Sequence, residues 1–288
     1  MASLFRKFRK KNIIKRTEVN VCTMAPNELL KGRTALITGG TGGIGYSIAE
    51  AYLNAGASVI ITGRTEKRIA AAVEQLKTTA GQHAGWVEGI VWDVSQTESL
   101  EQKFQEVLEL LRQHGHQHLH ILVNNAGILG CPLSGDTPEE FDAVISTNLK
   151  AVFFLSQQVA THMRDNGIKG NILNIASSSS LRPATSAYML SKWGIRGLTM
   201  GLAKVLIPHG IVVNGVAPGP TSTPMLREDD DSDMPLATNP TGRWGHPVEI
   251  ANMAVILVSD MSRLIVGDII YMTGGAGLIT QDDINFTF

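Results

Sequence analysis

The sequence predicts an α/β protein with a doubly wound, Rossmann-type parallel sheet of about seven strands and helices on both faces. Short runs rich in Val and Ile alternate with amphipathic stretches from Lys31 onward, which is typical of parallel sheets that are buried on both faces. The first run leads into a glycine cluster that precedes a helical stretch, as in dinucleotide-binding folds. No repeat or low-complexity linker divides the chain, so we expect a single domain over residues 24–288, preceded by a basic extension, residues 1–23.

Seven strands are expected because each run is short, rich in β-branched residues and bounded by turn-forming residues. The first, Thr34–Thr38, ends at the glycine cluster, and the second, Ser58–Thr62, is almost entirely apolar. The other runs span residues 86–92, 119–124, 170–176, 211–216 and 268–272. Because helical stretches separate the runs, the connections are expected to join parallel neighbours.

Helices are expected where apolar residues recur three or four positions apart. In residues 97–114, for example, the apolar positions from Leu100 to Leu111 share one face. The stretch 141–163 is long and is expected to form two helices with a bend near Asn148. The remaining helical stretches span residues 44–55, 66–79, 187–208 and 248–259.

Composition excludes several classes of protein. Apolar residues make up 43% and charged residues 18% of the chain, which excludes intrinsic disorder. No stretch approaches the ~18 consecutive apolar residues of a membrane-spanning helix. Two cysteines, Cys22 and Cys131, cannot form a disulfide framework, and no secretory signal pattern is visible, so we expect a cytoplasmic protein.

The formal net charge of −1 conceals an asymmetric distribution. Residues 1–23 hold seven Arg and Lys residues against Glu18 alone, which leaves 18 basic and 25 acidic residues, a net charge of −7, on residues 24–288. An acidic body disfavours binding to nucleic acid, and binding through the basic tail is the most distant hypothesis. The tail is expected to be a solvated extension or a segment upstream of a second start at Met24; a membrane-surface or organelle-targeting segment is the alternative.

The glycine cluster predicts a site for the diphosphate of a dinucleotide. The segment Thr38-Gly39-Gly40-Thr41-Gly42-Gly43-Ile44-Gly45 lies between a predicted strand and a predicted helix. Glycines in that context allow a tight turn and a close approach of the backbone to phosphate. The N-terminus of the following helix then presents unpaired N–H groups to the anion.

The end of the second strand predicts NADP(H) as the preferred cofactor. It contains Gly63 and Arg64, and it lacks the acidic residue that hydrogen-bonds a ribose hydroxyl in NAD-selective sites. The guanidinium of Arg64 suits a 2′-phosphate, with help from Lys67 or Arg68; NAD(H) is the alternative cofactor. Asp93, which ends the third strand, is expected either to accept a hydrogen bond from adenine or to cap the next helix.

A tyrosine and a lysine predict acid/base chemistry. Tyr188 and Lys192 are four positions apart on a predicted helix, so their side chains share a face. An ammonium group beside a phenol favours the phenolate and lowers the phenol pKa from ~10, which gives a general acid/base for a carbonyl or an alcohol. The fifth strand delivers Ser177, or as an alternative Ser178, to the carboxyl edge of the sheet, where ligands of open parallel sheets bind.

In this order and spacing the motifs resemble those of the soluble, single-domain short-chain dehydrogenases/reductases. The resemblance extends from about Leu30 to Gly277. It is carried by the glycine cluster, Asp93, Asn124-Asn125-Ala126-Gly127, Asn148, Ser177, Tyr188-x-x-x-Lys192 and Pro218-Gly219.

The resemblance implies four catalytic roles. Tyr188 would be the general acid/base, and Ser177 would stabilise the substrate oxygen. Lys192 would lower the pKa of the tyrosine and hold the nicotinamide ribose. Asn148 would anchor a water that links Lys192 to solvent.

The resemblance also implies the cofactor contacts and an assembly. Asn125 would lie near the adenosine ribose, Asp93 and Val94 near the adenine, and Thr221 and Thr223 near the nicotinamide carboxamide. The chain would form a homotetramer or dimer through the helices that bear Asn148 and Tyr188. The implied cofactor-binding residues are Thr38, Gly39, Thr41, Gly43, Ile44, Gly45, Arg64, Asp93, Val94, Asn125, Ala126, Gly127, Tyr188, Lys192, Pro218, Gly219, Thr221 and Thr223.

The histidines and Cys131 are not expected to carry chemistry. The four alternating histidines of residues 114–120 lack a carboxylate partner in the pattern, so a fortuitous surface cluster is expected and no metal. Cys131 is expected to be a small apolar residue beside the site, because no base is paired with it.

The substrate is predicted by class. Residues 217–247 are rich in Pro, Gly, Thr and acidic residues and too long for an ordinary connection, so we expect a substrate loop there. Its acidic run, residues 226–234, disfavours anionic substrates, and His209 stands where carrier-dependent 3-oxoacyl reductases of the family carry Arg. We therefore expect a neutral ketone, sugar, polyol or steroid-like alcohol; the alternatives are a 3-oxoacyl-(acyl carrier protein or coenzyme A) reductase and a non-catalytic NADP-sensing protein. The expected pocket residues are Ile128, Leu129, Leu181 and Met225.

Overall fold

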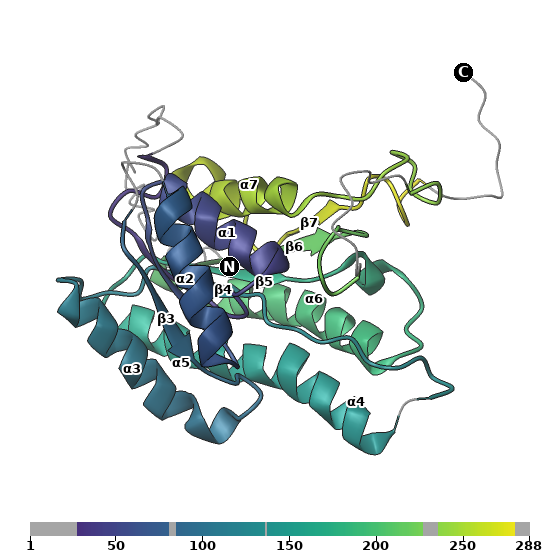
Figure 1. Ribbon diagram of the computed structural model, residues 1–288, viewed down its shortest axis with the longest axis horizontal. Helices are drawn as coiled ribbons and strands as arrows, with labels where there is room; N and C mark the ends of the chain where they lie inside the picture. Colours follow the sequence, from purple (N-terminus) through teal and green to yellow (C-terminus); the bar gives the residue numbers. More distant parts are fainter. Residues whose placement is uncertain (1–27, 81–84, 136, 227–235, 280–288) are drawn as a thin grey trace, which may run out of the picture.

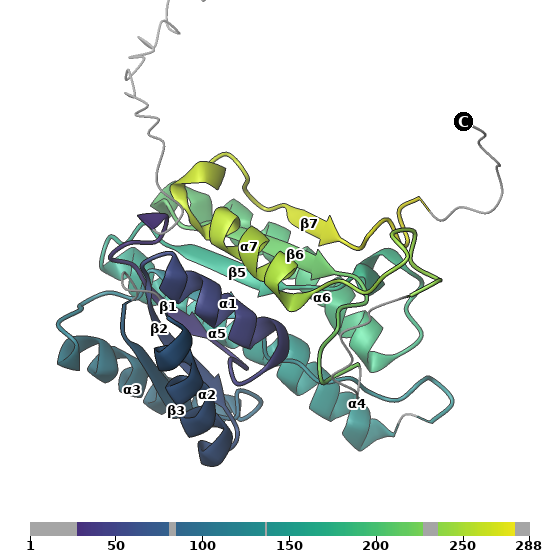
Figure 2. The same cartoon turned by 45° about the horizontal axis from the view of Figure 1, so that its top comes forward.

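The computed structural model describes residues 28–80, 85–135, 137–226 and 236–279. Seven parallel strands form one sheet in the order β3-β2-β1-β4-β5-β6-β7, and helices cover both faces (Figure 1, Figure 2). The predicted fold class is therefore confirmed. The basic extension with Cys22 and Met24, and the acidic run after Leu226, lie outside the described residues.

The sheet reverses its winding between β1 and β4. Because β1 pairs with β2 on one side and with β4 on the other, the chain crosses to the opposite half of the sheet after β3. The carboxyl ends of β1 and β4 therefore border the crevice in which such folds bind dinucleotides. The strands are β1 (Thr34–Ile37), β2 (Ser58–Gly63), β3 (Val87–Val91), β4 (Ile121–Asn124), β5 (Asn171–Ile175), β6 (Val212–Pro218) and β7 (Ile269–Met272).

The alternation of side chains along each strand builds two cores. Ile37 and Ile61 pack under one set of helices, and their neighbours Leu36 and Ile60 pack under the other; all four are fully buried. Burying an aliphatic side chain of this size contributes about 1.5–3 kcal/mol. One face is covered by α1 (Gly43–Asn54), α2 (Glu66–Thr79) and α7 (Pro247–Val258), the other by α3 (Leu100–Gln113), α5 (Ala151–Asp165) and α6 (Ala187–Leu206).

The predicted bend near Asn148 is a π-helical turn. Helix α4 (Pro138–Ile145) continues through π-helical residues Ser146–Lys150 into α5. Helix α4 begins three residues before the expected start. The reason is a capping box, in which the Thr137 hydroxyl accepts from the Glu140 backbone N–H (3.2 Å) and the Glu140 carboxylate accepts from the Thr137 N–H (3.3 Å). Apolar spacing does not report such a cap.

The alternating histidines are not entirely a surface cluster. His120 is half-buried at the start of β4, where its Nδ1 accepts from the Thr34 backbone N–H (3.2 Å). Burial, followed by the charges of Arg33 and neighbouring histidines, lowers the pKa of His120 to about 4. His114 does have a carboxylate neighbour, Glu88, at 3.4 Å. Among the residues that the structure describes, no group of three or more His, Cys, Asp or Glu could hold a metal ion.

Across the described ranges, no helix combines the length and the apolar character that crossing a membrane would require.

Candidate active site

The glycine turn after β1 is shaped to lie against another backbone. Gly39 and Gly43 have φ values of +66° and +55°, which side chains rarely adopt. A Cβ at Gly39 would lie 3.0 Å from the Ala126 Cα, and one at Gly45 would lie 2.3 Å from the Asn125 Nδ2. Helix α1 starts directly after this turn without a side-chain cap and without an acidic residue in its first turn. Its terminal N–H groups therefore suit an anion.

Two residues fasten this turn to β4. Asn125 Nδ2 donates to the carbonyls of Thr38 (2.9 Å) and Gly39 (3.1 Å). The Thr38 hydroxyl accepts from the backbone N–H groups of Asn125 and Ala126, each at 3.0 Å. The amide nitrogen of Asn125, which the resemblance assigns to the adenosine ribose, thus holds the phosphate turn in shape.

A pocket of about 410 Å³ lies between the ends of β2 and β3 and helix α3. Asp93 borders it, and its Oδ1 accepts from the backbone N–H (3.0 Å) and the hydroxyl (2.7 Å) of Ser95. These bonds close the turn after β3 and do not cap α3, whose N-cap is Ser99. Val94 beside it is buried. The lining residues are Arg64, Val91, Trp92, Asp93, Gln96, Ser99 and Lys103.

Two arginines flank the junction of the glycine turn with β2. Arg64 is exposed at the pocket described above. Arg68 places its Nη2 3.5 Å from the position that a Gly42 Cβ would occupy, so Arg68 is the neighbour that the structure brings to the turn. The side chain of Thr41 packs against Gly63, whose Cβ would lie 2.7 Å from the Thr41 Cγ2. Both cations therefore lie close to the end of β2.

Helix α6 brings Lys192 beneath Tyr188. The Lys192 Nζ lies 5.6 Å from the centroid of the Tyr188 ring, as the four-residue spacing predicts. Lys192 is 5% exposed, and its Nζ donates to the Ile175 carbonyl (2.8 Å) at the end of β5. Burial lowers the pKa of Lys192 to about 8, because the interior disfavours the charged form.

The pKa of Tyr188 is shifted in the direction opposite to that expected from Lys192. Burial raises the pKa of the Tyr188 phenol, and a hydrogen bond from Ser177 opposes that rise. Burial has the larger effect. The Lys192 amine donates to the carbonyl of Ile175 and lies over the tyrosine ring. Of the two candidate serines, Ser177 is the one that the structure brings to Tyr188.

Asn148 connects helix α6 to the segment that follows β4. Its Oδ1 accepts from the Ile128 N–H (2.9 Å), and its Nδ2 donates to the Ile128 carbonyl (2.9 Å) and to the Ser191 hydroxyl (3.2 Å). Ser191 in turn donates to the Tyr188 carbonyl (2.6 Å). A Cβ at Gly127 would lie 3.4 Å from the Asn148 Oδ1. The side-chain amide of Asn148 therefore joins α6 to the segment that follows β4.

The segment after β6 returns to the glycine turn. Gly219 donates its N–H to Met272 (2.9 Å), and the buried Thr221 hydroxyl donates to the Gly219 carbonyl (3.0 Å). The Thr223 Cγ2 lies 3.4 Å from the position of a Gly43 Cβ. The chain from Pro218 to Thr223 thus closes one side of the crevice.

The expected substrate-lining residues are unevenly placed. Leu129 and Met225 are 43% and 49% exposed, whereas Ile128 and Leu181 are half-buried. Two residues that the sequence did not indicate, Arg196 and Tyr271, bond Ser180 in the segment that follows Ser177. No local sequence signal could have found Tyr271, because it lies 91 positions from Ser180.

Comparison with known proteins finds relatives along most of the chain. A family model described as short chain dehydrogenase matches residues 33–233. The 3alpha-hydroxysteroid dehydrogenase of Mediterraneibacter gnavus is 35% identical over 253 residues, which cover 86% of this chain and 98% of that protein. The 3-oxoacyl-(acyl-carrier-protein) reductase of Aquifex aeolicus is 34% identical over 254 residues, with coverages of 85% and 98%.

A solved structure of a relative contains a cofactor. The putative NAD(P)-dependent gluconate 5-dehydrogenase of Beutenbergia cavernae, with bound NADP, is 32% identical and similar in structure with a TM-score of 0.75, over 87% of this chain and 98% of that one. With a family model that covers most of the chain and relatives that match along nearly their whole length, the protein belongs to the short-chain dehydrogenase family.

Proposed function

We propose that the protein is an NADP(H)-dependent oxidoreductase that moves a hydride between nicotinamide and the carbon of a carbonyl or secondary alcohol. One observation carries the proposal: Ser177, Tyr188 and Lys192 gather at the carboxyl edge of the sheet, and Asn148 joins their helix to the segment after β4 that bonds the glycine turn. The acid/base pair and a dinucleotide would then meet in one crevice.

The described residues fit a dinucleotide phosphate. The turn at Gly39 and Gly43 has no side chain that could block the approach of a diphosphate, and the uncapped N-terminus of α1 offers N–H donors to it. The guanidinium groups of Arg64 and Arg68 would bind a 2′-phosphate, which favours NADP(H). The NADP in the relative from Beutenbergia cavernae supports the same cofactor. When bound, the cofactor would supply or accept the hydride.

Side chains of the protein would transfer the proton and hydrogen-bond the substrate oxygen. In the reductive direction the Tyr188 phenol gives its proton to the carbonyl oxygen, while the Ser177 hydroxyl donates a hydrogen bond to that oxygen. Because burial raises the pKa of Tyr188, the phenol is protonated at neutral pH, as a proton donor must be. Lys192, with a pKa of about 8, can return a proton to the phenolate and would bind the ribose. The reverse reaction needs the phenolate and is favoured at higher pH.

We propose a neutral ketone, keto-sugar or steroid-like ketone as the substrate. The names of the relatives cover a steroid, a sugar acid and a carrier-bound 3-oxoacyl group, so the fold accommodates all of these classes. His209, at the end of α6, does not supply the permanent cation that an anionic carrier would meet there. A 3-oxoacyl thioester is the second candidate, supported by the reductase from Aquifex aeolicus.

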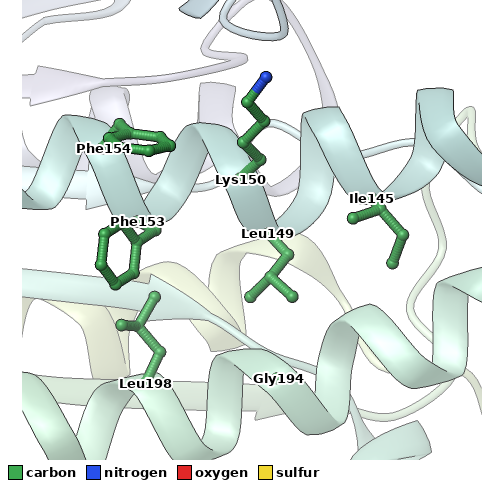
Figure 3. A pocket seen from close by; sticks show the side chains of 7 residues that line it. All are labelled: Ile145, Leu149, Lys150, Phe153, Phe154, Gly194 and Leu198. Carbon is green, nitrogen blue, oxygen red and sulfur yellow. The ribbon is translucent and has the colours of Figure 1, made fainter.

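We further propose that the enzyme is a cytoplasmic homodimer or homotetramer in which α5 and α6 face a second copy of the chain. These helices form an apolar groove between Leu149 and Phe153 on one side and Gly194 and Leu198 on the other (Figure 3). Phe153 is 46% exposed, and such a surface gains free energy when a partner covers it.

The test is NADPH oxidation with a keto-gluconate, a 3-ketosteroid and acetoacetyl-coenzyme A as oxidants. Tyr188→Phe is expected to lower turnover at least about 100-fold and to leave the NADPH dissociation constant within about twofold of the wild-type value. Tyr52→Phe is the matched control, since Tyr52 lies near the end of α1 and bonds the Ala254 carbonyl (3.3 Å) in the core. Full activity of Tyr188→Phe would contradict the proposal, and NADPH binding without turnover of any carbonyl would favour a cofactor-sensing protein.

A further inference from the structure

Ser177, the serine that faces Tyr188, is followed by a short helix whose residues hydrogen-bond the Ser177 backbone. This 3-10 helix, η4, spans Ser178–Leu181. Ser180 at its centre is fully buried, and both its hydroxyl (2.8 Å) and its N–H (3.0 Å) donate to the Ser177 carbonyl. The Ser177 Oγ accepts from the Ser179 N–H (3.1 Å). Because that bond occupies a lone pair of the Ser177 oxygen, the hydroxyl proton is available to Tyr188.

Tyr271 of strand β7 hydrogen-bonds the Ser180 side chain. The Tyr271 hydroxyl lies 3.1 Å from the Ser180 Oγ. Since the Ser180 proton is already donated to the Ser177 carbonyl, Tyr271 must be the donor in this pair. A chain of two hydrogen bonds thus runs from the edge strand of the sheet to the backbone of Ser177.

Helix α6 also holds the same short helix. Arg196 donates to the Ser180 carbonyl (3.2 Å), and Trp193 Nε1 donates to the Arg182 carbonyl (2.8 Å). The Arg196 guanidinium lies over the Trp193 ring at 5.4 Å, which fixes both side chains. Because Tyr188 lies on this helix too, α6 carries the phenol and also determines where its serine partner stands.

We propose that Ser180, held by Tyr271 and Arg196, is a positioning residue that keeps the Ser177 hydroxyl directed at Tyr188. This inference rests on the proposed function, in which Tyr188 transfers the proton and Ser177 hydrogen-bonds the substrate oxygen. It adds that the pairing of Ser177 with Tyr188 depends on a buried hydroxyl that is bonded to the Ser177 carbonyl and to the Tyr271 hydroxyl. A serine at this position is needed because an alanine would leave the Tyr271 hydroxyl and part of the Ser177 carbonyl without a partner.

The experiment measures the pKa of Tyr188, which reports its hydrogen bond with Ser177, and it needs no substrate. The chain has four tyrosines, so 3-fluorotyrosine labelling gives four 19F NMR signals, of which Tyr188 is assigned with Tyr188→Phe. Its pKa is measured by titration. Ser177→Ala is expected to raise this pKa by about one unit, the effect of losing a hydrogen bond to the phenolate. Ser180→Ala is expected to raise it in the same direction by a smaller amount, and the double variant no further than Ser177→Ala alone.

A matched control separates positioning from general destabilisation. Ser262 is also buried (3% exposed), and its hydroxyl likewise donates to the carbonyl three residues before it, that of Ser259 (3.4 Å), in a 3-10 turn after α7. Ser262→Ala should leave the pKa of Tyr188 unchanged. Tyr271→Phe, which removes one hydroxyl from a half-buried ring, serves as the second variant should Ser180→Ala fail to fold.

The outcomes distinguish this inference from the proposed function. If Ser177→Ala raises the pKa of Tyr188 while Ser180→Ala and Tyr271→Phe leave it at the wild-type value, the positioning role is overturned and the function stands. Additive shifts in the double variant would also overturn it, because Ser180 would then act by another route. If Ser177→Ala itself has no effect, Ser177 does not hydrogen-bond the Tyr188 phenolate and the inference falls, while the proposed function is still tested separately by NADPH oxidation with Tyr188→Phe.

Discussion

A methyl group at Gly45 should destabilise the glycine turn, although alanine has the higher helix propensity at this position. Gly45 lies inside α1, where alanine is ordinarily favoured over glycine by about 0.5–1 kcal/mol. A Cβ there would lie 2.3 Å from the Asn125 Nδ2 and 2.4 Å from the Gly39 carbonyl oxygen. Both distances are far below van der Waals contact, so the turn and the Asn125 side chain must move.

The size of the effect follows from the bonds that would break. Asn125 would give up its hydrogen bonds to the carbonyls of Thr38 and Gly39. At about 1–2 kcal/mol for each, Gly45→Ala should lower the free energy of unfolding by about 2–4 kcal/mol. For a domain of this size that corresponds to a fall of about 4–16 °C in Tm. Because the displaced turn is the proposed diphosphate site, NADPH should bind at least about tenfold more weakly.

The assay combines thermal unfolding followed by circular dichroism with titration of NADPH fluorescence. Gly201→Ala is the matched control, since Gly201 is exposed inside α6 and a Cβ there would have no neighbour within 4 Å. That variant should be as stable as the wild type or slightly more so, with unchanged NADPH affinity. If Gly45→Ala behaved like Gly201→Ala in both measurements, the close packing of the turn against Asn125 would be wrong.

Three further predictions concern the cofactor, the assembly and the pH dependence of stability. Arg64→Ala should raise the dissociation constant of NADPH about tenfold and that of NADH less than about twofold; equal losses would mean that Arg64 does not bind the 2′-phosphate. Phe153→Glu should reduce the mass measured by light scattering to that of a monomer, because it places a charge in the apolar groove; an unchanged mass would exclude this face from the interface. The pKa of His120 is lowered from 6.5 to about 4 in the folded protein, so its contribution to stability is complete above about pH 6.5 and is lost as the pH falls towards 4. Urea unfolding at several pH values should therefore show a smaller acid loss for His120→Gln than for the wild type, and parallel losses would contradict this.

The local patterns of the sequence were sufficient to predict the fold. Each predicted strand agrees with an observed one to within two residues at either end, and helix α2 agrees at both ends. Apolar period and glycine placement are local properties, and in a parallel α/β fold they determine the order of elements and the handedness of the connections. The exceptions depend on side-chain contacts, such as the capping box that starts α4 before its first apolar residue.

The site was predicted as a set of residues but not as a set of contacts. Spacing along α6 was enough to place Tyr188 and Lys192 on one face, because the helical period is fixed. It could not show that the Lys192 amine bonds the Ile175 carbonyl or that burial raises the pKa of the phenol, since both depend on a strand that lies 13 positions before the tyrosine.

The sequence by itself determined which residues reach the carboxyl edge of the sheet, because strand ends and helix starts are written in local patterns of glycine, apolar and turn-forming residues. Only the tertiary structure decided what those residues do there. Asn125 hydrogen-bonds the glycine turn, and Arg68 lies beside Gly42. Ser180 connects Tyr271 of β7 to the Ser177 carbonyl. Hydrogen bonds and desolvation act through space over a few ångströms, and the sequence separation of the partners carries no information about them.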